Sequence, residues 1–142
     1  MNEIVRQATC VVIAGKAVLI EGAPGSGKSS LALALIDRGA ELLGDDGVIL
    51  ASAGGRLMAR PHPNTRGLLE VRNVGLLPFP VCIEAPAALV LRLDESAPRF
   101  VEAAERTQIA GHDLPLLRLW PDDPVLPIKA ELALATYGLF RS

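Results

Sequence analysis

The residues best suited to chemistry form one short run that fits the phosphate-binding loop pattern G-x-x-x-x-G-K-S. Glycines let the backbone turn so that successive N–H groups point inward at phosphate oxygens. The lysine of this pattern reaches the β- and γ-phosphates, and the serine hydroxyl after it binds Mg²⁺. The pattern predicts binding of a nucleoside triphosphate by Gly22, Ala23, Pro24, Gly25, Ser26, Gly27, Lys28, Ser29 and Ser30.

The segments on either side of this run favour the same interpretation. Residues 18–20 are an apolar, strand-like run, and residues 30–36 are helix-like. A preceding strand and a following helix distinguish a working phosphate loop from a chance match, and the helix adds the positive end of its dipole. The alternative is an ordinary glycine-rich turn between a strand and a helix.

Three carboxylates could supply what phosphate transfer needs beyond binding, namely control of a metal and a group that handles the acceptor's proton. Asp45 and Asp46 follow a short apolar run after the loop helix. One could hold Mg²⁺ while its neighbour accepts a hydroxyl proton, and Glu70 could complete the metal shell, because Mg²⁺ prefers oxygen ligands. The residues alone leave two alternatives open. These are an exposed Asp-Asp-Gly turn and a surface pairing of Glu70 with Arg72 or Lys16.

Length and composition restrict the class of protein. The 142 residues favour one domain over 1–142, and 4% aromatic content makes its core mainly aliphatic. No apolar stretch approaches the roughly 18–20 residues that span a membrane, and no signal-peptide pattern is present. The net charge of −2 gives no electrostatic reason to bind nucleic acid. Cys10 and Cys82 lie in apolar runs and are expected to be buried thiols, which favours the cytoplasm.

The apolar runs and turn residues predict an α/β domain with a mixed sheet and few helices. Residues 9–13 and 17–20 are expected to form a hairpin that leads into the phosphate loop, and the loop helix is expected to end near Arg38 before Gly39. A closing helix is expected at 128–137 behind Pro127. Further strands are expected at 48–50, 56–59, 68–71, 76–77, 87–93, 100–104 and 114–120, the last two on a more exposed side.

Taken together, these segments resemble the catalytic domain of bacterial HPr kinase/phosphorylase. Four stretches in the family's order carry the resemblance: residues 18–29, 37–39, 44–46 and 68–75. The last looks like the family's signature Leu-Leu-Glu-Ile-Arg-Gly, with Asn73 in place of the first glycine. Positions 8 to about 80 are covered well and the remainder only loosely. The chain is similar to the short form of the family found in some alphaproteobacteria.

The resemblance implies a fold, an activity and a set of roles. The fold implied is the phosphate-loop core shared with phosphoenolpyruvate carboxykinases. The activity implied is an ATP- and Mg²⁺-dependent serine kinase acting on HPr, the phosphocarrier of the phosphotransferase system, and the family forms homo-oligomers. Asp45 would be the general base, and the proton donor in dephosphorylation, with Lys28 and Arg72 as further catalytic residues. The metal would be held by Ser29, Asp46 and Glu70.

Two departures from the family pattern bear on the dephosphorylating reaction. Gln7 stands where the family usually has a histidine, and a glutamine cannot shuttle a proton near neutral pH. Residues 122–131 contain no arginine, and Lys129 is their only cation. Two alternatives therefore stay open: a nucleotide-sensing module of the same fold without transfer, and a small-molecule phosphate-loop kinase. The scattered arginines of the second half disfavour the latter.

Overall fold

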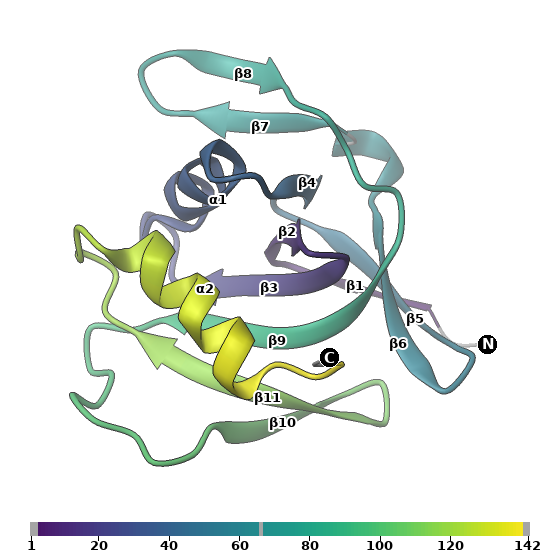
Figure 1. Cartoon of the computed structure of the whole chain (residues 1–142). Helices are drawn as coiled ribbons and strands as arrows, with labels where there is room; N and C mark the ends of the chain where they lie inside the picture. Colours follow the sequence, from purple (N-terminus) through teal and green to yellow (C-terminus); the bar gives the residue numbers. More distant parts are fainter. Residues whose placement is uncertain (1–2, 66, 141–142) are drawn as a thin grey trace.

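Within residues 3–65 and 67–140, which a computed structural model describes, strands predominate and two α-helices lie against them (Figure 1). In chain order the elements are β1 (Glu3–Arg6), β2 (Thr9–Ile13), β3 (Lys16–Gly22), α1 (Lys28–Asp37), β4 (Glu41–Gly44), β5 (Val48–Ala53), β6 (Arg56–Pro61), a 3₁₀ turn (Pro63–Thr65), β7 (Leu68–Val71), β8 (Gly75–Pro78), β9 (Ala85–Leu93), β10 (Glu105–Ile109), β11 (His112–Leu119) and α2 (Leu126–Tyr137). Neither helix is long and apolar enough to cross a membrane.

The large sheet is mixed, and parallel strands form its centre. β9 pairs in parallel with β3 on one side and with β11 on the other, while β2 pairs with β3 as the expected antiparallel hairpin. Gly22 at the end of β3 lies opposite Leu93 at the end of β9. Because parallel strands end at the same edge, the phosphate loop begins at the carboxyl edge, where α/β sheets bind ligands. The prediction of an α/β mixed sheet with few helices is confirmed.

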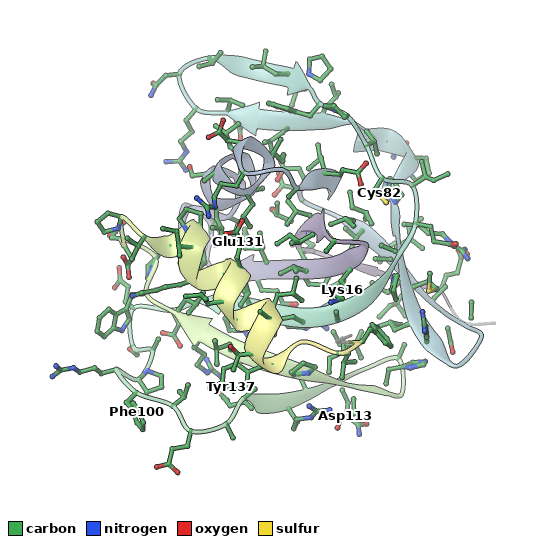
Figure 2. All side chains as sticks on the ribbon, in the orientation of Figure 1. Lys16, Cys82, Phe100, Asp113, Glu131 and Tyr137 are labelled. Carbon is green, nitrogen blue, oxygen red and sulfur yellow. The ribbon has the colours of Figure 1, made fainter. Side chains whose placement is uncertain are left out.

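Alternate residues of β3 face two apolar layers, as the period of a strand requires. Val18 and Ile20 pack in a cluster with α1 and α2, whereas Ala17 and Leu19 pack on the other face with residues of β5 and β6. The largest fully buried side chains are leucines and isoleucines, so the expected aliphatic core is confirmed. Between the helices, Glu131 of α2 pairs with Arg38 beyond the end of α1 (Figure 2).

β7 and β8 form a separate two-stranded hairpin that lies beyond α1 and β4, at the top of Figure 1. Its register places Leu69 opposite Leu77 and Glu70 opposite Leu76. Leu69 is fully buried in the cluster that contains α1, so one face of the hairpin is fixed to the core. The opposite face of the hairpin carries Glu70, which is exposed.

The structure differs from the strand predictions in three respects. Residues 100–104 form no strand, and Phe100 is 77% exposed at the periphery (Figure 2). The strand in this part of the chain is the polar β10. It forms because a tight turn places it antiparallel to β11. β11 is buried at 114–117 instead of exposed, since it adds in parallel to the central β9. β1 was missed, because it gains its strand partner only through β5, far along the chain.

The cysteine prediction holds for one of the two thiols. Cys10 is fully buried, and burial raises the pKa of its thiol well above the usual range. Cys82 is only half-buried, because it lies in the segment between β8 and β9, where its thiol contacts the Glu84 carbonyl. Both cysteines are free.

Candidate phosphate-transfer site

The phosphate loop (residues 22–29) joins the end of β3 to the start of α1, as the sequence predicts. Gly25 and Gly27 have φ angles of +78° and +101°, left-handed conformations that favour glycine. The Ser26 N–H donates to the Ala23 carbonyl at 3.0 Å and closes the turn. Lys28 is the first residue of α1, and its Nζ donates to the Gly22 carbonyl at 3.0 Å. The lysine therefore lies back across the loop.

The interior of the loop fits a phosphate group. A Cβ atom at Gly22 would lie 2.5 Å from Ser26 Oγ and 3.2 Å from the Leu93 carbonyl, so only glycine leaves the turn open. Ser26 Oγ is buried and has no hydrogen-bond partner among the residues that the structure describes. A buried hydroxyl without a partner in a glycine-rich loop suits an anionic ligand that supplies the missing acceptor.

Asp45 is the structural centre of the acidic segment. Its side chain is buried, at 5% exposure for the residue. Oδ1 accepts hydrogen bonds from Ser29 Oγ at 2.8 Å and Thr9 Oγ1 at 3.0 Å, and Oδ2 accepts one from the Glu70 N–H at 3.2 Å. These donors compensate for the removal of a carboxylate from water. The alternative of an exposed turn is therefore wrong for Asp45.

Asp46, Glu70 and Arg72 are exposed and border a cavity of ≈ 270 Å³ above the phosphate loop. This loop cavity is further lined by Gln7, Pro24, Gly25, Gly27, Lys28, Ser29 and Ser30. An Arg72 guanidinium nitrogen lies 3.8 Å from the position of a Cβ at Gly25, so the arginine reaches over the loop. In the described part of the chain, no ion pair joins Glu70 to Arg72 or Lys16, and that alternative is wrong.

The donor set around the loop cavity suits a hard cation that is shared with a nucleotide. Across residues 3–65 and 67–140, no three His, Cys, Asp or Glu side chains converge to hold a metal by themselves. Mg²⁺ is usually bound by one or two protein oxygens together with substrate phosphates. Ser29, Asp46 and Glu70 all border the cavity into which such phosphates would fit. The residues present therefore fit a metal that binds together with its nucleotide.

Sequence reasoning missed two features that hold the site together. Thr9 is fully buried and supports Asp45; its signal was a polar residue in an apolar strand. Glu21, just before the loop, pairs with Arg6 at 2.6 Å and Arg92 at 2.9 Å. Burial by itself raises the pKa of Glu21. The two arginines lower this pKa by more than burial raises it, so the carboxyl pKa lies below its ordinary value. This cluster ties β1 and β9 to the start of the loop.

The two positions that depart from the family pattern have different surroundings. Gln7 borders the loop cavity, beside the residues expected to bind phosphate. Lys129 instead pairs with Asp123 and lies 5.8 Å from the centroid of the Trp120 ring. It is therefore not a free cation that points at the phosphate loop.

Comparisons with known proteins show which proteins this chain is similar to. The family model for the HPr Serine kinase C-terminal domain matches residues 1–82. The HPr kinase/phosphorylase of Mycoplasma mycoides subsp. mycoides SC is 32% identical over 131 residues, which cover 87% of this chain and 39% of that protein. The protein of the same name from Nitrosomonas europaea is 31% identical over 140 residues, covering 93% and 43%. The chain thus spans about two fifths of the length of these curated relatives.

A solved structure shows the same fold. The Hpr(Ser) kinase/phosphatase from Coxiella burnetii superposes with a TM-score of 0.83 at 27% identity, covering 92% of this chain and 88% of that one. The matched residues of the family model include the phosphate loop, the acidic pair and the β7–β8 hairpin, in agreement with the well-covered segment expected from the sequence. Because this match extends over more than half of its residues, the chain belongs to the HPr serine kinase C-terminal domain family.

Proposed function

We propose that this chain is an ATP-dependent protein-serine kinase that transfers the γ-phosphoryl group to a serine of HPr, with residues 1–142 as one catalytic domain in the cytoplasm. The observation that carries the proposal is the hydrogen bond between Ser29 and the buried Asp45. It connects the phosphate loop to the acidic segment, beside a cavity that Asp46, Glu70 and Arg72 border. The family relationship supports the same reaction.

The phosphate loop would provide most of the electrostatic stabilisation. Phosphoryl transfer passes through a loose transition state, so catalysis depends chiefly on positioning and on charge. Main-chain N–H groups of residues 23–28 would hold the phosphates, with the Lys28 ammonium group and the Arg72 guanidinium group above them. Ser29, Asp46 and Glu70 would hold Mg²⁺, which when bound supplies further positive charge to the phosphate oxygens.

Asp45 would receive the proton of the acceptor hydroxyl. Its Oδ1 is occupied by two hydroxyl donors, whereas Oδ2 accepts only the Glu70 N–H among the residues that the structure describes. Oδ2 therefore keeps a lone pair for the incoming serine, and Asp45 borders a second cavity next to the loop cavity. As the serine oxygen bonds to phosphorus, the bond to the ADP oxygen breaks and the serine proton passes to Oδ2. In the reverse reaction the same carboxyl group would return the proton.

The test is incubation with Mg²⁺, γ-labelled ATP and HPr from the same organism, followed by mapping of the labelled residue. We expect label on an HPr serine, lost in Lys28→Ala and in Asp45→Asn. Lys16→Ala is a matched control, because this lysine begins β3, at the end of the strand away from the loop. No transfer by the wild-type chain, or equal loss in the Lys16 variant, would contradict the proposal. Adding inorganic phosphate to labelled HPr tests the reverse reaction.

A nucleotide-sensing module is the second candidate, and Lys129 is the observation that favours it. Its pairing with Asp123 leaves residues 122–131 without a free cation for the transferred phosphate. The sensor would bind ATP and HPr without transferring label. Calorimetric titration of both ligands beside the transfer assay separates the two candidates, since only the kinase labels HPr.

A further inference from the structure

A further cavity adjoins the phosphate loop on its other side, at the carboxyl edge of the sheet. This edge cavity has a volume of ≈ 460 Å³, within the roughly 300–1,000 Å³ of small-molecule sites. Its walls are residues 23–26 of the loop, residues 93–96 at the end of β9 and residues 121–122 beyond β11. Pro24 and Gly25 border both the edge cavity and the loop cavity, so a ligand in one can continue into the other.

The order of the strands places the phosphate loop between the edge cavity and Asp45 (Figure 1). β3 carries the loop; β9 and then β11 follow on one side of it, and β2 and then β4 follow on the other. Asp45 comes directly after β4, whereas the edge cavity lies at the ends of β9 and β11. In phosphoryl transfer the attacking and leaving oxygens stand roughly in line, on opposite sides of the phosphorus. With the proposed acceptor at Asp45, the leaving ADP therefore extends toward β9 and β11.

Two carboxylates of the edge cavity are available to a ligand. Glu95 and Asp122 are exposed and line the cavity, and in the described part of the chain neither side chain forms an ion pair or a hydrogen bond. Asp94, which also lines the cavity, is by contrast paired with Arg118 at 3.0 Å. An ionised carboxylate only accepts hydrogen bonds, so these two acids select for donors. The hydroxyl groups of a sugar are such donors, whereas a further phosphate group would be repelled.

From this arrangement we infer that the edge cavity is a nucleoside subsite, in which Glu95 and Asp122 accept hydrogen bonds from the ribose hydroxyls of the nucleotide. The inference rests on the proposed kinase function and names the class of phosphate donor: a ribonucleotide, in preference to a dideoxynucleotide or an inorganic polyphosphate. The two acids favour the ribonucleotide by hydrogen bonding and disfavour the bare polyphosphate by charge, so they select in both directions.

Calorimetric titrations of the full chain with Mg²⁺ test the subsite without phosphate transfer. We expect the wild-type chain to bind ATP roughly tenfold more tightly than 2′,3′-dideoxy-ATP, the range for losing a hydrogen bond to a partly hydrated charged group. The double variant Glu95→Ala/Asp122→Ala should lose this preference. It should bind inorganic tripolyphosphate as tightly as wild type or more tightly, because two negative charges are removed.

The double variant Glu41→Ala/Glu102→Ala is the matched control, since it removes the same charge from exposed positions outside the edge and loop cavities. Equal affinity of the wild-type chain for ATP and dideoxy-ATP, or a preference that survives in the Glu95/Asp122 variant, would overturn the inference. Loss of the preference in the control variant would also overturn it.

Labelling of HPr, measured beside these titrations, separates the subsite from the kinase proposal. Labelled HPr without a preference for ATP over dideoxy-ATP would reject the subsite and leave the kinase standing. A preference that depends on Glu95 and Asp122, without labelled HPr, would leave the subsite standing and reject the kinase. Failure of every triphosphate to bind would reject both.

Discussion

Replacing Asp45 with asparagine is the most informative change, because one buried carboxylate accepts hydrogen bonds from three separate segments. The amide oxygen can keep the hydroxyls of Ser29 and Thr9, which both donate to Oδ1. The NH₂ group that replaces Oδ2 then faces the Glu70 N–H, which is also a donor. The variant loses the hydrogen bond from the Glu70 N–H to a charged acceptor, and it brings two partly buried N–H donors face to face.

The magnitude follows from these contacts. A hydrogen bond to a charged group contributes about 1.5–3 kcal/mol, so we expect unfolding to become easier by roughly 2 kcal/mol. At about 2–4 °C per kcal/mol for a chain of this size, the Tm falls by roughly 4–8 °C. Because Asp45 is the proposed proton acceptor, we expect its loss to lower the transfer rate by about 10²–10⁴. We expect ATP affinity to stay within a few-fold, because the proposed nucleotide-binding residues Lys28 and Ser29 are unchanged.

Three measurements check these expectations: thermal unfolding, calorimetric ATP binding with Mg²⁺, and transfer to HPr. Asp113→Asn is the control, since the Asp113 side chain is 50% exposed on β11 and lies outside both cavities. A Tm within 1 °C of wild type in the Asp45 variant would refute the assignment of its hydrogen bonds. Wild-type transfer would refute its role as base. Collapse of ATP affinity would show that Asp45 acts mainly through Ser29 and the metal.

Two further predictions concern the arginines and the acid at the loop. Arg72→Ala is expected to weaken ATP binding roughly tenfold in calorimetry, because the Arg72 guanidinium reaches over the loop. Arg72→Lys should recover part of this affinity, and the control Arg99→Ala, in an exposed loop, should leave it unchanged. Glu21 has a lowered pKa in the folded protein, so as the pH falls the carboxyl group is protonated first in the unfolded chain. The stability that Glu21 contributes is therefore present above about pH 4.5 and is lost below it. Chemical denaturation between pH 7 and 3 should show a shallower acid loss for Glu21→Gln, and an identical slope would contradict this assignment.

Much of the local architecture could be predicted from the sequence, because its signals lie within a few residues of one another. The β2–β3 hairpin, the strand–loop–helix context of the phosphate loop and the β7–β8 hairpin all formed where turn residues separate apolar runs. The closing helix also formed; it begins at Leu126, one residue before Pro127. Each depends on backbone preferences and on a period of two or 3.6 residues that a single segment carries by itself. The roles of the site residues stay predictions.

Only the tertiary structure decided which side chains meet. Asp45 contacts Ser29, Thr9 and the Glu70 N–H across separations of 16 to 36 residues, and Glu21 joins Arg92 across 71. Nothing in the local pattern around Asp45 separates a buried acceptor from an exposed turn; burial came from the packing of β2, α1 and β7 around it. The sequence by itself determined that a phosphate loop and nearby acids exist. Their convergence required the sheet, because contacts between distant residues depend on strand order and register, which local preferences do not contain.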